Sequence, residues 1–430
     1  MEFEVTVIGG GLAGCEAAWQ LAKFGIKVKL FEMRPVKNTP CHKTSNLAEL
    51  VCSNSFGATE ETTPGGILKA ELRFLDSLII SCADKCRLPA GSALAVDRIA
   101  FSKLVTEKIE SNSLITVIRK EILDIPDGFC IIATGPVTSL DFSEKISSLT
   151  GKDFLYFFDA VSPVVSLESI DLKKAFWLSR YEKGKDYLNC PLTKEEYENF
   201  VYELANAEQH PLHDFEKDRF FEGCLPVEEL AKRGVDTLRF GPLSPKGLKD
   251  PDGFMPYAVL QLRPENKERT MLNLVGCQTN LTWSEQKRVF RMIPALSNAE
   301  FLRFGVMHRN IFLNAPVVLS DGIHLKTNPR ILFAGQITGT EGYTESCASG
   351  LAAGLTLALS LTKNININFP EETAIGSLLK YLKTADSKNF QPMNFNLGLL
   401  PPLQKKIHNR AELCKFLVQR SLKSLEKMLI

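Results

Sequence analysis

The sequence contains no segment that could cross a membrane as a helix. None of its apolar runs approaches the ~20 residues that a membrane-spanning helix requires, although 44% of the 430 residues are hydrophobic. The first apolar segment, Val5 to Ile8, begins almost at Met1, so we expect no signal or transit peptide. We therefore expect a cytoplasmic globular protein that is long enough to form two domains.

The sequence also lacks an excess of either charge and a pattern of paired cysteines. Its formal net charge is +1 at pH 7, so any nucleic-acid binding must come from a local patch. The 11 cysteines include no C-x-x-C pair, which favours reduced thiols over a disulfide framework. Cys82 and Cys86 could face each other on a helix, but no histidine accompanies them, and we predict no metal site.

The first thirty residues, in contrast, form a complete nucleotide-binding pattern. A short β-branched run, Val5 to Ile8, predicts a buried strand and is followed by G-x-G-x-x-G and a periodic helical stretch. A second strand, Val28 to Phe31, ends on Glu32, where a carboxylate can accept hydrogen bonds from ribose hydroxyls. The glycines permit a tight turn, close approach to a pyrophosphate and close helix packing. The predicted cofactor-binding residues of this unit are Gly9, Gly10, Gly11, Leu12, Ala13, Gly14 and Glu32.

Two later segments favour FAD over a nicotinamide cofactor alone. Residues 131–135, IIATG, predict a strand that returns the chain to the first domain, as in two-dinucleotide flavoproteins. Residues 331–354 predict a strand, a glycine-rich turn and a helix. This segment resembles the late flavin-contacting part of glutathione-reductase-like folds, where a helix N-terminus faces the flavin. These segments add five predicted cofactor-binding residues, namely Ala133, Thr134, Gly135, Gly335 and Gln336.

The fold that we predict is therefore α/β, with a discontinuous Rossmann-like FAD-binding domain of the glutathione-reductase type. Between about Lys183 and Ala295 the sequence becomes more charged, more aromatic and less periodic, which predicts an inserted α+β domain. We place the first part of the FAD-binding domain at residues 1–184, the insertion at 185–295 and the second part at 296–430. The second part includes a basic C-terminal tail.

Two cysteines are candidates for chemistry. Cys224 precedes Pro226, which suits the first turn of a helix, and a helix N-terminus lowers a thiol pKa. Cys52 lies among small polar residues in a loop, which favours reactivity. Either cysteine could equally be a small buried hydrophobic residue, as most cysteines are.

Three other features carry an open choice between function and structure. His308 could stack on a planar ligand or be a structural histidine, and Tyr343 could transfer protons or simply pack. The tail from Leu403 to Ile430 has an excess of cations, including Lys405, Lys406 and Arg410. It predicts either a phosphate-binding face or a solvated helix face.

Longer segments of the chain resemble a known family, the bacterial folate- and FAD-dependent tRNA (uracil-5-)-methyltransferases (TrmFO). The resemblance extends from the start of the chain to about Gly354. The segments that carry it are GGGLAG, LVCSNSFG, GGILKAELR, PAGSALAVDR, EGCLPVEELA, RFGPLSPKGL, NLVGCQTNLT, QKRVFRMIP and GVMHRN. AGQITGTEGY is shared with the larger tRNA-modifying flavoprotein MnmG (GidA) as well, and does not discriminate between the two.

The resemblance implies the reaction and its partners. Methylenetetrahydrofolate would donate a one-carbon unit to C5 of the T-loop uridine at position 54 of tRNA, giving 5-methyluridine. FAD, reduced by NADH or NADPH, would be both carbon carrier and reductant. No protein partner or membrane association is implied.

The resemblance also implies a role for each candidate residue. Cys224 of EGCLP would be the thiolate that adds to uracil C6, which activates C5 as a nucleophile. Cys52 of LVCSNS would act in acid–base chemistry or in a transient adduct, and Tyr343 of EGY would remove the C5 proton. His308 of GVMHRN would hold the folate pterin against the flavin, and the basic tail would contact tRNA.

Three alternatives remain at this stage. An MnmG-like modifier of the wobble uridine is the nearest, although that family is much longer. A disulfide reductase or generic NAD(P)H-dependent flavoprotein would need a closely spaced cysteine pair, and Cys41 and Cys52 are poorly spaced for it. A non-catalytic flavin-bound RNA-binding protein would leave the thiols inert.

Overall fold

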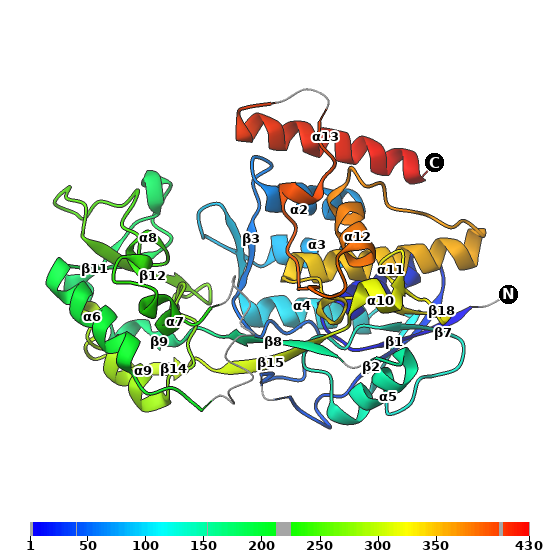
Figure 1. Ribbon diagram of the computed structural model, residues 1–430, viewed down its shortest axis with the longest axis horizontal. Helices are drawn as coiled ribbons and strands as arrows, with labels where there is room; N and C mark the ends of the chain where they lie inside the picture. The colour runs from blue at the N-terminus through cyan, green and yellow to red at the C-terminus, as the bar shows by residue number, and fades with distance from the viewer. Residues whose placement is uncertain (1–2, 40, 153, 212–224, 404–406, 430) are drawn as a thin grey trace.

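The computed structural model describes residues 3–39, 41–152, 154–211, 225–403 and 407–429. Figure 1 shows two lobes side by side, a larger one that contains both ends of the described chain and a smaller one built from the middle. The larger lobe is organised on a sheet whose central strands are parallel. Across this sheet the strands follow in the order β16 (Leu319–Ser320), β17 (His324–Leu325), β18 (Asn328–Phe333), β7 (Phe129–Ile132), β1 (Glu4–Ile8), β2 (Lys27–Glu32) and β6 (Ile115–Arg119).

Helices cover this sheet, and glycines allow two of them to pack closely. Helix α1 (Leu12–Lys23) lies against α11 (Tyr343–Lys363). A Cβ on Gly350 would stand 2.3 Å from the Ala13 carbonyl oxygen, and one on Gly354 would stand 2.7 Å from that of Ala17. Only glycine permits this backbone separation. The other helices of the larger lobe are α2 (Pro64–Phe74), α3 (Leu78–Lys85), α4 (Arg98–Glu110), α5 (Leu140–Thr150), α10 (Ala315–Val318), α12 (Ala374–Thr384) and α13 (Arg410–Leu429).

The predicted fold class is confirmed. Strand β1 pairs in parallel with β2 on one side and with β7 on the other, and β7 pairs in parallel with β18. The glycine-rich turn after β1 and the turns after β7 and β18 therefore meet at one edge of the sheet, because the carboxyl ends of parallel strands point the same way. This edge carries the pocket described below.

The smaller lobe has its own sheet and its own hydrophobic core. Its strands follow in the order β10 (Phe176–Trp177), β11 (Leu188–Leu192), β12 (Ala258–Pro264), β13 (Met271–Leu274), β9 (Val164–Ser166) and β14 (Phe301–Arg303). Helices α6 (Lys194–Asn206), α7 (Val227–Lys232), α8 (Thr237–Phe240) and α9 (Trp283–Phe290) pack with it.

The connection between the lobes is a pair of antiparallel strands, β8 (Leu155–Ala160) and β15 (Met307–Phe312), visible between the lobes in Figure 1. The core of the smaller lobe takes residues from Val165 to Phe301. It thus reaches beyond the predicted insertion, residues 185–295, at both ends, and the division into domains at 184/185 and 295/296 stays a prediction.

Two local differences from the predicted elements have identifiable causes. The sequence predicts one helix from Ile67 to Ser81, but the chain forms α2 and α3 with a break at Asp76, whose φ is +58°. Ser77 then caps α3, since its side chain accepts a hydrogen bond from the Ile80 amide at 3.2 Å. The predicted loop from Pro89 to Arg98 contains strand β5 (Ala93–Val96), which pairs with β3 (Ser55–Ala58) and β4 (Arg87–Leu88).

The basic tail forms helix α13, which packs on α2 through a buried face that includes Cys414, Leu417 and Leu425. Figure 1 shows it at the side of the larger lobe away from β8 and β15. Its outer face exposes cations such as Arg410 and Lys415. Within the described ranges, none of the helices combines the length and the apolar character needed to span a membrane.

Candidate functional site

A pocket opens at the edge of the larger sheet where β1, β7 and β18 end. It contains about 1060 Å³ of space that protein atoms do not fill, part of it continuous with solvent. The residues predicted to bind a cofactor that line it are Gly9, Gly10, Gly11, Leu12, Ala13, Glu32, Ala133, Thr134, Gly135, Gly335 and Gln336. The structure thus brings together three segments that are more than a hundred residues apart in the sequence.

The glycines of the first turn differ in what surrounds them. Gly9 has φ +104°, and a Cβ there would stand 2.4 Å from the Ala133 carbonyl oxygen. Gly14, which does not line the pocket, fits under the turn because its Cβ would meet the Gly9 carbonyl oxygen at 1.8 Å. Gly11 has open space where its side chain would be. Gly9 and Gly14 therefore shape the turn, and Gly11 leaves room for a ligand above it.

Two helices begin at this pocket without a side-chain cap. Gly11 is the N-cap of α1 and Gly342 is the N-cap of α11, and neither has a side chain that could accept from the first amides. Leu12 and Ala13 of α1 and Tyr343 of α11 line the pocket. Free amides and the positive end of a helix dipole favour an anionic group.

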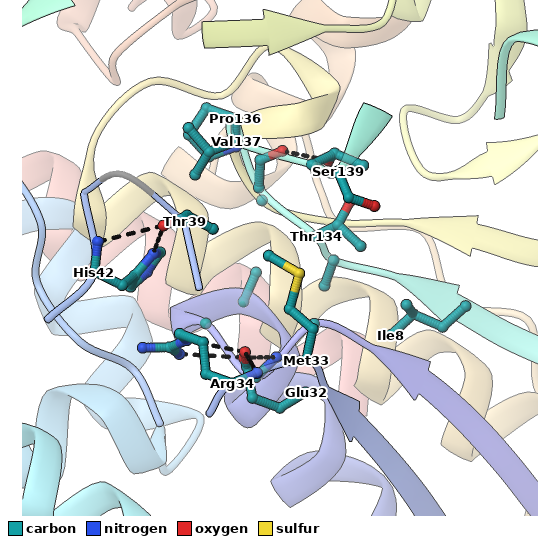
Figure 2. A pocket seen from close by; sticks show the side chains of 18 of the residues that line it. Ile8, Glu32, Met33, Arg34, Thr39, His42, Thr134, Pro136, Val137 and Ser139 are labelled. Atoms are coloured by element: carbon teal, nitrogen blue, oxygen red, sulfur yellow. Dashed lines mark hydrogen bonds and ion pairs between the residues drawn. The ribbon is translucent and has the colours of Figure 1, made fainter. Parts of the chain in front are cut away.

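Glu32 lies at the predicted position, but its carboxylate oxygens already accept hydrogen bonds from other residues of the protein. Its carboxylate accepts from the Gly10 amide at 3.0 Å and from the Arg34 amide, Nε and Nη2 at 3.0, 2.9 and 3.2 Å. Burial raises the pKa of Glu32, but the hydrogen bonds and charge of Arg34 outweigh it, so the pKa is lowered overall. Figure 2 shows Arg34 folded against Glu32 at the wall of the pocket.

Arg34 also joins Glu32 to the loop that follows β2. Its Nη1 donates to Glu49 at 3.0 Å and to the Thr44 carbonyl at 3.2 Å, and its side chain is only 2% exposed. Thr39 and His42 of the same loop line the pocket, with the Thr39 hydroxyl 2.5 Å from the His42 ring (Figure 2). The loop is thereby fixed at the pocket rim.

A second group of residues lies where the two lobes meet, and we call it the junction cluster: Cys52, Arg98, Glu265 and Tyr343. The Cys52 amide donates to the Tyr343 hydroxyl at 2.8 Å. Arg98 Nη2 donates to the Cys52 carbonyl at 3.1 Å, and Arg98 Nε donates to Glu265 at 2.9 Å. Because Tyr343 also lines the pocket, the cluster adjoins the predicted flavin site.

Both lobes contribute to the junction cluster. Glu265 follows β12 in the smaller lobe, whereas Cys52 and Tyr343 belong to the larger lobe. Asn54 holds the Cys52 loop to the smaller lobe, donating to the Pro264 carbonyl at 3.0 Å and accepting from Arg263 at 2.9 Å. The loop is therefore fixed from both sides.

The protonation of Cys52 and Tyr343 is set mainly by burial. Burial raises the pKa of the Cys52 thiol, Asp159 raises it further, and Arg98 opposes the shift. Burial also raises the pKa of the Tyr343 hydroxyl, with Cys52 adding to the shift. The sequence predicts a reactive thiol in polar surroundings, but this environment keeps Cys52 as a neutral thiol and Tyr343 as a neutral phenol.

Glu341 is a further buried acid beside the pocket. Gln336 donates to its carboxylate at 2.6 Å. Burial, followed by the charge of Asp159, raises the pKa of Glu341 well above its ordinary value. The proton affinity of this carboxyl, next to the pocket residue Gln336, is therefore raised.

Several predicted residues cannot be placed. Cys224, Lys405 and Lys406 lie outside the described residues, and for His308 the structure describes the backbone in β15 only. Arg410, at the start of α13, is exposed. Among the residues that are described, no group of three histidine, cysteine, aspartate or glutamate side chains could hold a metal ion.

Sequence reasoning missed Arg34, Glu49, Glu265 and Glu341. Arg34 had a detectable signal, since an arginine two residues after the acid predicted to bind ribose points to the same side of an extended chain. Glu265 had none, because its partner Arg98 lies 167 residues away in the sequence.

Comparison with known proteins identifies the family. The family model for glucose inhibited division protein A (GIDA) matches residues 4–364. The structure resembles GidA of Aquifex aeolicus with a TM-score of 0.68 and 17% identity, over 99% of this chain and 76% of that one; at this identity the likeness shows the fold.

Full-length relatives are much more similar in sequence. The methylenetetrahydrofolate–tRNA-(uracil-5-)-methyltransferase TrmFO of Natranaerobius thermophilus is 56% identical over 428 residues, which cover 99% of each chain. The TrmFO of Carboxydothermus hydrogenoformans is 55% identical over 428 residues, again 99% of each, and that of Listeria welshimeri is 54% identical over 430 residues. The chain therefore belongs to the TrmFO family of methylenetetrahydrofolate–tRNA-(uracil-5-)-methyltransferases, within the wider GIDA group.

Proposed function

We infer that the chain methylates C5 of the T-loop uridine at position 54 of tRNA, with 5,10-methylenetetrahydrofolate as carbon donor and reduced FAD as carrier and reductant. The observation that carries this inference is full-length identity of 53–56% to relatives with this activity in their names. The pocket and the junction cluster supply the required types of group, an anion-binding cofactor site next to a thiol and a phenol.

The residues present fit FAD. The space above Gly11 and the uncapped N-terminus of α1 suit a pyrophosphate, and the uncapped N-terminus of α11 suits the electron-rich pyrimidine end of a flavin. Ribose hydroxyls would have to share Glu32 with Arg34, since all its acceptor positions have protein donors. When bound, FAD supplies reducing electrons and carries the one-carbon unit.

Cys224 is proposed as the nucleophile. Its thiolate would add to C6 of the uracil, which makes C5 nucleophilic. The helix that follows it, α7, begins at Val227, one residue later than the predicted Pro226, and Pro226 is its N-cap. Glu228 of α7 is fixed by the Thr279 hydroxyl at 2.8 Å and the Asn280 amide at 2.6 Å. These bonds hold the segment after Cys224 against the smaller lobe.

Cys52 and Tyr343 are proposed to handle protons at the flavin side of the uracil. A neutral thiol and a neutral phenol are proton donors in the resting state, so each must lose its proton before it can act as a base. The positive charge of Arg98 opposes the rise in the pKa of both groups. Arg98 also donates a hydrogen bond to the carbonyl of Cys52. We assign removal of the C5 proton to Tyr343, with Cys52 in acid–base work or a transient adduct.

The remaining partners are proposed from the same resemblance. His308 would hold the folate pterin, and NADH or NADPH would reduce the FAD. Lys405, Lys406 and Arg410 would contact tRNA phosphates, consistent with the exposed Arg410. A tRNA substrate and free thiols at the described cysteines support action in the cytoplasm.

The test is an assay with unmodified tRNA, NADPH and methylenetetrahydrofolate labelled in its one-carbon unit. We expect label at C5 of uridine 54 with the wild-type protein. We expect none with Cys224→Ala, although the variant should keep its full FAD content. Label from S-adenosylmethionine, label at the wobble uridine, or full activity of Cys224→Ala would contradict the proposal. Cys277→Ala is the matched control, because Cys277 is buried in the core of the smaller lobe.

A further inference from the structure

Arg98 joins the loop that carries Cys52 to the smaller lobe. It is the first residue of α4, and its Nη1 and Nη2 donate to the carbonyl oxygens of Leu50 and Cys52, the latter at 3.1 Å. The Nε atom of the same side chain donates to Glu265 at 2.9 Å. The Arg98 side chain is 14% exposed and that of Glu265 is 5% exposed. Because water competes little for these donors, the charged hydrogen bonds hold their geometry better than those of a surface pair.

The same loop residue contacts the phenol at the pocket. The Cys52 amide donates to the Tyr343 hydroxyl at 2.8 Å, while the Cys52 carbonyl accepts from Arg98. The backbone of Cys52 is therefore held from two sides, by Arg98 and by Tyr343. A misplacement of about 1 Å at a reacting group can lower a rate about 100-fold. The bond from Arg98 thus acts on the relative position of the two residues proposed for proton transfer.

Glu265 stands at the turn of a hairpin formed by β12 and β13. The two strands pair in antiparallel fashion, with Pro264 opposite Leu272, and the Glu265 amide donates to the carbonyl of residue 271 at 2.9 Å. The Asp97 carboxylate accepts from the Lys267 amide at 3.3 Å, which is a second contact between the start of α4 and this turn. The hairpin turn is therefore fixed against the larger lobe.

The chain at the other end of β13 holds the segment that follows Cys224. The Val227 amide, at the start of α7, donates to the Gln278 carbonyl at 2.7 Å. Glu228 of α7 accepts from the Asn280 amide at 2.6 Å. One hydrogen-bonded hairpin thus contacts Arg98 at its turn and leads directly to the residues that fix α7.

We propose that Arg98 is a positioning residue that couples the placement of the smaller lobe, in whose chain Cys224 lies, to the placement of Cys52 and Tyr343. This inference rests on the proposed function. The nucleophile that adds to C6 and the groups that move the C5 proton act on one uracil ring, yet they belong to different lobes. The contact of Arg98 with Glu265 keeps the two sets of groups in one geometry. Arg98 acts through the loop and does not touch the uracil.

A purely structural role for Arg98 predicts a different pattern of effects. In Arg98→Met the Glu265 carboxylate stays buried without its cation, which lowers stability. In Arg98→Met/Glu265→Gln no such charge remains, so most of the stability should return, although the loop carbonyls still lack the guanidinium. Asn54 keeps its bonds to the Pro264 carbonyl at 3.0 Å and to Arg263 at 2.9 Å. The lobes therefore stay joined, and the double variant should fold.

The first test is hydrogen exchange at the Cys52 amide in the FAD-loaded protein, which requires no turnover. We expect this amide to exchange at least about tenfold faster in Arg98→Met/Glu265→Gln than in wild type, because its bond to Tyr343 opens more often. Tyr343→Phe, which removes the acceptor, gives the reference for complete loss of that bond. Arg73→Met/Asp84→Asn removes an exposed ion pair of the larger lobe and is the matched control, with exchange at the wild-type rate.

The second test is methylation of unmodified tRNA with NADPH and methylenetetrahydrofolate. We expect kcat for 5-methyluridine formation to fall about 10- to 100-fold in Arg98→Met/Glu265→Gln. The KM for tRNA, the FAD content and the rate of FAD reduction by NADPH should stay within about twofold of wild type. Arg98→Lys should recover part of the rate, because an ammonium group can bond a loop carbonyl and Glu265 but lacks the planar set of donors.

Four outcomes would overturn the proposal. Unchanged exchange at the Cys52 amide would show that Arg98 does not hold the loop, and a wild-type kcat in the double variant would show that this contact does not affect the reaction. A melting temperature that falls in the double variant in parallel with kcat would make the role structural. A raised KM for tRNA with unchanged kcat would assign Arg98 to tRNA binding. Absence of 5-methyluridine formation by the wild-type protein would instead contradict the proposed function, and the exchange measurement, which needs no tRNA, distinguishes the two failures.

Discussion

The buried arginine behind the pocket provides the sharpest test of how the cofactor site is held. Arg34 bridges Glu32 and Glu49, and all three side chains are less than a tenth exposed. Removal of one partner from a buried ion pair costs about 3–5 kcal/mol. Glu32 keeps the amides of Gly10 and residue 34, and Glu49 keeps the Lys43 and Thr44 amides and the Thr44 hydroxyl. We therefore expect Arg34→Met to lower the free energy of unfolding by about 3 kcal/mol, at the lower end of that range.

A second variant separates the lost bonds from the charges left behind. In Arg34→Met/Glu32→Gln/Glu49→Gln no carboxylate remains buried without a cation, so we expect at least half of the lost stability to return. Arg34→Met should also retain less FAD per chain, because Arg34 and Glu49 fix the loop at the pocket rim.

The assay is urea unfolding of the FAD-free protein, followed by the fluorescence of Trp19 on α1. The other tryptophans, Trp177 and Trp283, belong to the smaller lobe and are replaced by phenylalanine in all variants. Arg73→Met is the matched control, because its pair with Asp84 is more than a third exposed and should be worth less than about 1 kcal/mol. Equal losses in Arg34→Met and Arg73→Met, or no recovery in the triple variant, would refute the reasoning.

Three further predictions follow from individual contacts. Gly14→Ala should lower both thermal stability and FAD content, since its Cβ would overlap the Gly9 carbonyl oxygen, whereas Gly11→Ala, with open space around its Cβ, should lower FAD content alone; equal melting temperatures for the two would contradict this. Burial raises the pKa of Glu71 to about 7, so the native state binds the extra proton and stability should fall as the pH rises from about 4.5 to 7. Glu71→Gln should flatten that part of the melting-temperature profile, and an unchanged profile would argue against it. Combined replacement of Lys405, Lys406 and Arg410 by alanine should raise the KM for tRNA and reduce its salt dependence without changing flavin reduction by NADPH; unchanged salt dependence would leave the tail a solvated helix.

Local patterns predicted the elements around the cofactor site well. Strands β7 and β18 end in the predicted turns. Long-range features were less accessible. The break at Asp76 needed a positive φ that the apolar periodicity of residues 67–81 does not reveal. The strand in residues 93–96 depends on pairing with β3 and β4, which are remote in sequence or short.

Among the candidate site residues, too, local sequence predicted the identities, whereas their contacts depend on tertiary packing. Cys52 and Tyr343 were predicted from motifs, but their shared hydrogen bond joins residues 291 positions apart. Their raised pKa values also come from the packing around them, and the composition of the Cys52 loop alone predicted the opposite environment. The role of Cys224 stays a prediction of the EGCLP motif, because the residue lies outside the described ranges.

The sequence by itself determined the first strand–turn–helix–strand unit and the family. Each step of that unit follows from neighbours within thirty residues, because the glycines, the helix and Glu32 act through the local backbone. Only the tertiary structure decided that Arg34 would donate hydrogen bonds to Glu32, and that Arg98 would join Glu265 of the smaller lobe to Cys52, which contacts Tyr343. Those contacts depend on how separate segments of the chain pack against one another.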